Sequence, residues 1–259
     1  MPWMTPPVAR RVAALALLAA LPVILAGCGS RNRELQPGAY RAVLETPGGD
    51  LPFGLDVALE ESGFVLYLVN GEERIRVDAV TVADGALNAT LPAGGSTLSA
   101  RITRKGLEGE VLLPGAGPER QVLTFEARLG ETWRFFEEPL TDNADLSGRW
   151  SMTFTDDVDR AEAAVAEFAQ SFSTVTGTIY APSGNHPNLA GEIRGNDLYL
   201  SRFDGTSAWL YRAQVNERGD LVGEFWSGRN SHRRFVAVRD PDAVLEPGGV
   251  APQSLPPGA

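Results

Sequence analysis

The stretch LAGEIRGNDLYLSRFDGTSAWLYRAQVNERGDLVGEFW, residues 189–226, decides the fold class. It contains four short segments in which apolar and polar residues alternate, at 189–193, 198–203, 208–215 and 221–226. The dipeptides Gly-Asn, Asp-Gly and Gly-Asp lie between these segments, and such residues are typical of tight turns. Short alternating segments joined by tight turns predict antiparallel strands of a barrel or a sandwich.

The same pattern extends along most of the chain. We therefore expect an all-β protein made of two related antiparallel meander units that form barrel- or sandwich-like domains. Besides the four segments above, strands are expected at 39–45, 51–59, 64–69, 74–82, 87–91, 98–103, 107–113, 122–129, 149–155, 173–180 and 234–238.

The order of the segments indicates an internal repeat. Gly38-Ala39-Tyr40 aligns with Gly148-Arg149-Trp150 at an offset of 110, and residues 106–111 align with residues 220–225 at an offset of 114. Offsets that grow slowly are expected of a duplication followed by small loop insertions.

One segment gives conflicting signals. Residues 159–170, DRAEAAVAEFAQ, are rich in strong helix formers, yet in the repeat they correspond to the strand expected at 51–59. We favour an edge strand over a helix here.

The amino terminus is typical of a bacterial lipoprotein. Residues 1–11 are short and basic, residues 12–25 are apolar, and Leu25-Ala26-Gly27-Cys28 matches a lipobox, where acyl chains such as palmitate are attached and the signal peptide is cleaved. The apolar run is shorter than the roughly 20 residues that span a bilayer. We expect lipidation at Cys28 and, because Gly29 follows in place of Asp, a location on the periplasmic face of the outer membrane.

These features divide the chain into six parts. Residues 245–259 are expected to form a disordered tail because they are rich in Pro and Gly. The parts are a signal peptide at 1–27, a lipidated tether at 28–37, a first β unit at 38–130, a linker at 131–147, a second β unit at 148–244 and a disordered tail at 245–259.

Charge and cysteine content exclude several classes of function. Removal of the signal peptide takes away Arg10 and Arg11 but no acid, so the net charge of −10 becomes −12. Such a body is repelled by nucleic acids and by anionic lipid, so we expect no nucleic-acid partner and a membrane contact only through the lipid on Cys28. With one cysteine, the chain can form no internal disulfide and no thiolate metal site.

No catalytic, metal or cofactor signature is evident. Both histidines, His186 and His232, fall in expected turns, and surface-turn histidines are the simplest interpretation. Residues 156–159 (DDVD) lack the glycine and the distal glutamate of a calcium loop, so a solvated acidic turn is favoured. Glu110 and Glu224 occupy equivalent repeat positions and are formal candidates for a glycosidase pair, although outward-facing residues are the simpler interpretation.

Aromatic residues cluster in the second unit. Those on one face of a strand pair could line a pocket for a small apolar or ring-shaped ligand, and otherwise they fill the core. The candidate ligand-binding residues are Tyr199, Phe203, Trp209, Tyr211 and Trp226.

The segments at 176–180, 189–193, 198–205 and 208–213, followed by 223–228 and 237–241, carry a resemblance. Over about 38–245 the chain resembles the β-rich region that precedes the thioredoxin domain in TlpA-like thiol-disulfide reductase lipoproteins, and residues 51–53 and 70–73 fit the same pattern. The resemblance implies an accessory envelope domain, here without the thioredoxin domain. No Cys-x-x-Cys is present, so no redox residue carries over.

We therefore expect a non-enzymatic, membrane-anchored envelope lipoprotein that acts as a binding or protein-interaction module, without a cofactor. Its partner is expected to be an envelope protein or a small apolar ligand. The alternatives are an accessory domain of an envelope thiol-disulfide exchange system and a cryptic hydrolase.

Overall fold

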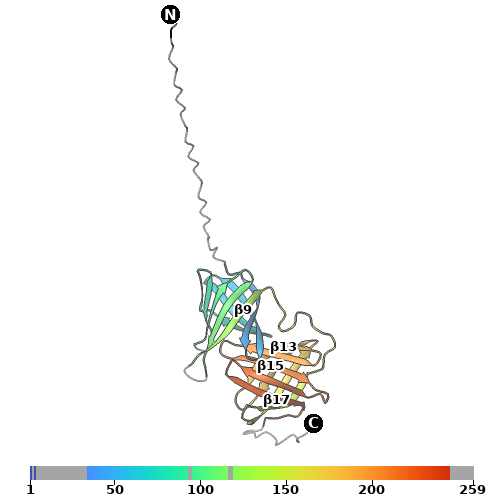
Figure 1. The fold of residues 1–259 in the computed structure, drawn as a ribbon. Helices are drawn as coiled ribbons and strands as arrows, with labels where there is room; N and C mark the ends of the chain where they lie inside the picture. Colours follow the sequence, from blue (N-terminus) through green and yellow to red (C-terminus); the bar gives the residue numbers. More distant parts are fainter. Residues whose placement is uncertain (2, 4–33, 93–94, 116–118, 246–259) are drawn as a thin grey trace. The chain divides into compact units, whose positions relative to one another are not determined.

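The computed structural model describes residues 1, 3, 34–92, 95–115 and 119–245. These residues form seventeen β-strands, β1 to β17, and no helix lies among them (Figure 1). The prediction of an all-β protein with two antiparallel meander units is therefore confirmed. The expected signal peptide, Cys28 and the tail from residue 246 onward lie outside the described residues.

The first nine strands form one antiparallel sheet, here called the N-terminal sheet. Its order is β4-β3-β2-β1-β9-β8-β7-β6-β5, so the pairing of β1 with β9 brings β4 and β5 to the two edges and β5 packs against β3 in a nearly closed barrel. The strands are β1 (Gly38–Thr46), β2 (Gly49–Glu60), β3 (Gly63–Asn70), β4 (Glu73–Val77), β5 (Val80–Ala83), β6 (Ala86–Thr90), β7 (Thr97–Ile102), β8 (Gly106–Leu113) and β9 (Gln121–Leu129).

The single strand expected at 74–82 is wrong. β4 ends at Val77, where it pairs with β3, and β5 begins at Val80, where it pairs with β6. A tight turn separates them, in which the Val80 amide donates to the Asp78 carbonyl at 2.9 Å. Ile75 and Val77 face the core from odd-numbered positions, whereas Val80 and Val82 do so from even-numbered ones, so the alternation shifts by one residue at the break. This shift marks the end of β4, but it does not reveal that the two pieces are opposite edges of the sheet.

The remaining strands form a closed antiparallel barrel, here called the C-terminal barrel. Each strand pairs with the next one along the chain, and the pairing of β17 with β10 closes the circle. The strands are β10 (Gly148–Thr155), β11 (Ala161–Ser171), β12 (Thr174–Tyr180), β13 (His186–Arg194), β14 (Asp197–Phe203), β15 (Ala208–Val215), β16 (Leu221–Ser227) and β17 (Ser231–Arg239).

The conflict over residues 159–170 is resolved as a strand. β11 pairs with β10 on one side and with β12 on the other, so it is an internal strand of the closed barrel and not the edge strand that was expected. Its inward side chains include Ala164, Ala166 and Phe168. Tertiary pairing on both sides overrides the helix propensity of the alanine-rich sequence.

The two units begin in the same way. Tyr40 on β1 donates from its hydroxyl to the Gln36 carbonyl at 2.7 Å, and Trp150 on β10 donates from Nε1 to the Leu146 carbonyl at 3.0 Å. Both aromatic side chains are buried, and in each case the acceptor lies four residues earlier. Each aromatic ring thus fixes the segment that leads into its unit.

The two units share a core. The N-terminal sheet packs its apolar face around Phe53 and Phe125, and β14 and β15 add Phe203, Ala208 and Leu210 from the outer face of the C-terminal barrel. The ring centroids of Phe53 and Phe203 lie 4.8 Å apart. The described residues from 34 onward consequently belong to one compact unit.

None of the described residues forms a helix with the length and apolar character needed to cross a membrane.

Candidate functional site

One end of the C-terminal barrel carries a group of polar and aromatic side chains. At this end, here called the mouth, lie the turns that join β10 to β11, β12 to β13, β14 to β15 and β16 to β17. Strand alternation turns the last or first side chains of these strands toward the interior. The inward residues at the mouth are Phe154, Glu162, His186, Arg202, Trp209, Tyr211, Phe225, Arg233 and Phe235.

His186 lies at the centre of this group. It is the first residue of β13, and its ring is partly buried with its centroid 4.3 Å from the Trp209 ring and 5.1 Å from the Phe225 ring. Its Nδ1 forms a hydrogen bond with the Tyr211 hydroxyl. The expectation of a surface-turn histidine is therefore wrong, because β13 begins three residues earlier than the strand expected at 189–193 and carries the ring into the barrel.

The imidazole is held in its uncharged form. Burial, together with the positive charges of Arg233 and Arg202, lowers the pKa of His186 to about 4, although Glu162 opposes this shift. Burial also raises the pKa of Tyr211, so its hydroxyl keeps its proton. Nδ1 of His186 is the one hydrogen-bonding partner of this hydroxyl among the described residues, so we assign the hydroxyl as the donor. This assignment places the His186 proton on Nε2, which has no hydrogen-bonding partner among the described residues.

An ion pair stands beside the aromatic group. Arg233 on β17 donates to Glu162 on β11 at 2.5 Å, and its guanidinium lies 5.6 Å from the centroid of the Phe154 ring. Ser183 donates to the same carboxylate from its amide and its hydroxyl, at 2.8 and 3.0 Å. Although burial opposes it, these bonds from Ser183 and Arg233 lower the pKa of Glu162, so the pair stays charged at neutral pH.

A small cavity opens next to this ion pair. Its volume is about 230 Å³, and Phe154 forms its apolar wall. Its polar lining comes from Asp156, Arg160, Glu162 and Arg233, which carry two negative and two positive charges. The mouth therefore offers an aromatic surface, one unpartnered N–H donor and a balanced rim of charges.

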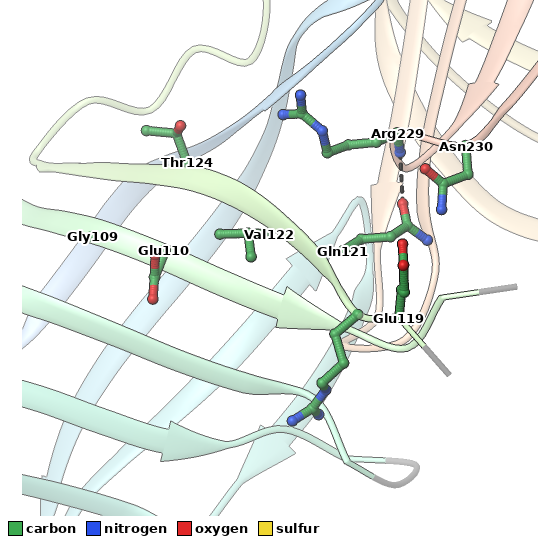
Figure 2. A pocket seen from close by; sticks show the side chains of 9 residues that line it. Gly109, Glu110, Glu119, Gln121, Val122, Thr124, Arg229 and Asn230 are labelled. Atoms are coloured by element: carbon green, nitrogen blue, oxygen red, sulfur yellow. Dashed lines mark hydrogen bonds between the residues drawn. The ribbon is translucent and has the colours of Figure 1, made fainter. Parts of the chain in front are cut away.

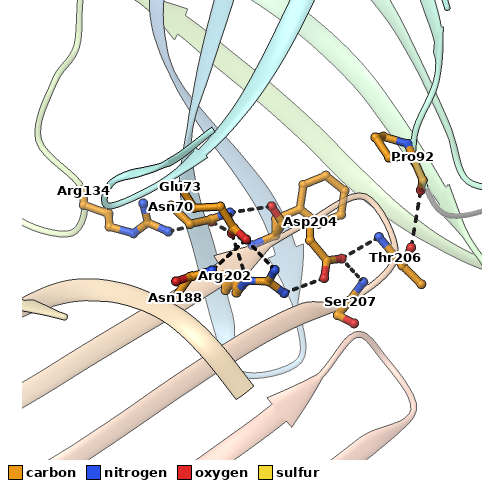
Figure 3. Close-up of polar contacts among 10 residues, drawn as sticks. Asn70, Glu73, Pro92, Arg134, Asn188, Arg202, Asp204, Thr206 and Ser207 are labelled. Carbon is orange, nitrogen blue, oxygen red and sulfur yellow. Dashed lines mark hydrogen bonds and ion pairs between the residues drawn. The ribbon is translucent and has the colours of Figure 1, made fainter. Parts of the chain in front are cut away.

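Arg202 connects the mouth to the N-terminal sheet, as Figure 3 shows. Its guanidinium lies 5.3 Å from the Trp209 ring centroid, and it pairs with Glu73 of β4 at 3.0 Å and with Asp204 at 2.5 Å. Asn188 donates to the same Glu73 carboxylate at 2.7 Å. Because the Arg202 side chain is only 8% exposed, these contacts fix one wall of the mouth to the N-terminal sheet.

The five predicted ligand-binding residues do not lie together. Trp209 and Tyr211 face the barrel interior at the mouth. Tyr199 contacts the rings of two residues of the segment between β9 and β10 on the outer face of the barrel, and Phe203 belongs to the shared core. Trp226, also on the outer face, stacks on His232 with ring centroids 5.2 Å apart.

Sequence reasoning placed His186 in a turn and did not single out Glu162 or Arg233. The inward orientation of Arg233 could be predicted from strand alternation, because Arg233 lies two and four residues before the inward residues Phe235 and Ala237 of β17. Nothing in the sequence brings β11 and β17 to the two sides of β10, which is what places Glu162 beside Arg233.

The other candidate groups do not form a site together. Glu110 lines an open depression of about 520 Å³ with residues of β9 and of the turn after β16, where the Arg229 amide donates to Gln121 at 2.7 Å (Figure 2). Glu224 instead lies 3.3 Å from Nε2 of His232 and is absent from the lining of that depression.

The acidic turn at 156–159 is stabilised internally. Asp156 accepts hydrogen bonds from the amides of Val158 and Arg160, at 3.0 and 2.9 Å. Over the described ranges, no three His, Cys, Asp or Glu side chains come together as metal ligands.

The comparisons with known proteins leave the family open. The chain matches no protein-family model, and no curated protein sequence matches it. Among solved structures it is similar to a protein of unknown function from the DUF3598 family of Nostoc punctiforme, with 14% identity and a TM-score of 0.28 over 78% of this chain and 94% of that one. The resemblance to TlpA-like lipoproteins stays a prediction, and the site is interpreted from its own geometry.

Proposed function

We propose that this protein is a membrane-tethered, non-enzymatic binding protein that takes a small planar ligand at the mouth of its C-terminal barrel. One observation carries the proposal: an uncharged imidazole stands between aromatic rings with its Nε2–H unpartnered among the described residues. This Nε2–H is not fully buried, because Oγ of Ser96 is the one fully buried unpaired side-chain atom among the described residues, so a ligand acceptor can reach it at the entrance of the barrel.

The surroundings of His186 favour a flat ligand. Phe225 is only 2% exposed, whereas Trp209 is partly exposed and can stack on a flat ligand. Aromatic stacking adds about 0.5–1.5 kcal/mol per pair beyond area burial. The cavity beside the ion pair shares Phe154 with this group of rings, and its volume of about 230 Å³ lies below the usual size range of drug-sized sites, so a ligand of one or two rings is the best fit.

The electrostatics support binding over acid–base catalysis. A general base works best when its pKa lies near the operating pH, whereas burial lowers the pKa of His186 to about 4. The carboxylate of Glu162 is engaged by Ser183 and Arg233. We therefore favour a hydrogen-bonding role for the imidazole.

The ligand site is tested with two probes that differ in one atom. Quinoline has a ring nitrogen that can accept from Nε2, and naphthalene has the same shape without an acceptor. We expect the unit formed by residues 32–259 to bind quinoline more tightly, by about tenfold, since a net hydrogen bond contributes about 1 kcal/mol or slightly more.

Two variants and a matched control locate the binding. Trp209→Ala should abolish quinoline binding, and His186→Phe should remove the preference for quinoline over naphthalene. His232→Phe, on the outer face, should change neither affinity. Equal binding of quinoline by wild-type protein and Trp209→Ala would show that the mouth is not the site.

The membrane tether is a separate part of the proposal. We propose that acyl chains on Cys28 hold the protein on the periplasmic face of the outer membrane. Mass spectrometry of the protein from its host should find a lipidated Cys28 as the first residue, and Cys28→Ser should release the protein from the membrane fraction. An unmodified, uncleaved amino terminus would contradict the tether but not the ligand site.

A further inference from the structure

A second cavity lies where outer faces of the N-terminal sheet and of the C-terminal barrel meet. It has a volume of about 340 Å³ and is lined by β1, β2 and β3, by β12 and β13, and by residues 131–134 of the segment that joins the two units. Because it is formed on the outer side of both units, it is separate from the mouth described above.

Arg41 of β1 provides an incompletely paired cation in this cavity. Its guanidinium lies 3.7 Å from the centroid of the Trp133 ring, and its Nε donates to the Arg134 carbonyl at 2.9 Å. Among the described residues, neither of its Nη atoms has a hydrogen-bonding or ion-pair partner. Arg202, by contrast, is fully engaged by two carboxylates.

A second guanidinium lines the same cavity. Arg134 donates from Nε and Nη2 to the hydroxyl and the carbonyl of Ser201, both at 3.0 Å. It also donates from Nη2 to Oδ1 of Asn70 at 3.4 Å (Figure 3). All of these acceptors are neutral. Burial and the charge of Arg41 lower the pKa of Arg134 to about 10, although Glu192 opposes this shift.

Three carboxylates line the cavity, and two of them are engaged by other groups. Glu192 accepts from the amides of Phe135 and Phe136, each at 2.8 Å, and Asp56 pairs with Arg74 at 2.6 Å. The carboxylate of the third, Glu131, has no hydrogen-bonding or ion-pair partner among the described residues; burial lowers the pKa of Arg41, and the charge of Glu131 opposes this. The Nη atoms of Arg41 thus stay available to a planar acceptor that enters the cavity.

Small side chains make the room for such a ligand. Ala39, Gly54, Gly71 and Ala190 line the cavity, and a Cβ at Gly54 would lie only 2.9 Å from Cβ of Val69. These small residues form an apolar part of the lining of the same cavity that the Arg41 guanidinium lines. A ligand with one acidic group and a compact hydrocarbon part matches both features.

We propose that this cavity binds a small organic carboxylate, which pairs with the Nη atoms of Arg41 while its hydrocarbon part lies over the small residues. A planar carboxylate matches the guanidinium fork in a bidentate manner. The single charge is preferred over a doubly charged phosphate, because Asp56, Glu131 and Glu192 also line the cavity and repel additional negative charge. The carboxylate can belong to a free acid or to the C-terminus of a short peptide.

The test uses the full-length lipidated protein and hydrophilic probes in calorimetry. Cyclohexanecarboxylate represents a free acid, N-acetylleucine represents a peptide terminus, and cyclohexanecarboxamide is the uncharged match of the first. We expect binding of at least one of the two carboxylates and at least tenfold weaker binding of the amide, because hydrogen bonds to charged groups contribute about 1.5–3 kcal/mol. Preference for either acid identifies the source, and absence of binding by both at millimolar concentration overturns the proposal.

Variants assign the binding to Arg41. Arg41→Gln should weaken carboxylate binding by about tenfold or more, and Arg41→Lys should restore part of it, because it keeps the charge but loses the fork. Arg101→Gln removes an exposed arginine that pairs with Glu108 on β8, and it should leave the affinity unchanged. Unaltered binding by Arg41→Gln would overturn the assignment, and the comparison of acid with amide on the unaltered chain remains decisive if that variant fails to fold.

Discussion

Acidification should destabilise this protein through His186. The ordinary pKa of a histidine is about 6.5, and burial lowers the pKa of His186 to about 4 in the fold. Between these pH values the His186 ring is protonated in the unfolded chain but stays neutral in the folded chain. The stability contributed by the neutral ring is therefore complete above about pH 6.5 and is lost as the pH falls toward 4.

The size of the effect follows from the two pKa values. Between pH 7.5 and pH 4.5, this single group lowers the free energy of unfolding by about 2 to 3 kcal/mol. That loss is a large share of the 5–15 kcal/mol that typically stabilises a folded protein. The imidazole is only partly exposed and lies against Trp209 and Phe225, so little solvent screening reduces the value.

Urea unfolding at both pH values measures this loss. Carboxylates also titrate in this interval, so the quantity of interest is the difference between wild-type protein and His186→Gln. The variant should be less stable at pH 7.5 but lose about 2 to 3 kcal/mol less than wild type on acidification. His232→Gln, which alters an outer-face histidine between Asp157 and Glu224, should show no such protection. Equal losses in wild type and His186→Gln would refute the reasoning.

Three further substitutions test how the two units are held together and where the chain is strained. Phe203→Ala should lower the free energy of unfolding by about 3–5 kcal/mol, because it leaves a cavity beside Phe53 in the shared core; urea titration checks this, and a loss below 1 kcal/mol would contradict the shared core. Asn70→Ala should cost about 2 kcal/mol or more in the same assay, since the Asn70 amide group donates to the carbonyl of Phe203 at 2.9 Å and accepts from its amide at 3.0 Å, and both buried groups lose their partner. Phe172→Asn should raise the melting temperature, with a gain of about 0.5–1 kcal/mol, because Phe172 is 90% exposed at φ +56°, a conformation that asparagine adopts more readily. An unchanged or lower melting temperature would show that the Phe172 backbone is not strained.

Much of the strand pattern could be predicted from the sequence because alternation and turn residues are local signals. The break between β4 and β5 also has a local signal, because the core-facing positions change from odd to even after Val77, but no local signal shows that the two strands have different partners. The strand at β11 was favoured by the repeat against its propensity. Its position inside a closed barrel depends on the pairing of β17 with β10, which no local signal specifies.

The aromatic residues of β14 and β15 show the limit of predicting side-chain orientation from strand alternation. Phe203 pairs with Ala208 across the turn at 204–207, and this register places Tyr199 opposite Arg212. Tyr199 and Phe203 therefore face outward, while Trp209 and Tyr211 face the interior. The turn at Asp204 and Gly205 allows this register to be predicted from the sequence. The sequence does not show which face of these strands lies inside the barrel.

The site at the mouth depends on contacts that are distant in the sequence. Glu162 and Arg233 meet because their strands flank β10, and Arg202 reaches Glu73 across the junction of the two units. Such pairs follow from topology, and a single sequence carries no pattern that brings them together.

The core of the N-terminal sheet is completed only after the residues that the C-terminal barrel adds to it have been synthesised. β9 ends at Leu129, so part of the apolar interior of the nascent N-terminal sheet stays uncovered while the ribosome adds residues 130–203. A chain cut between the units would remain in that exposed condition permanently.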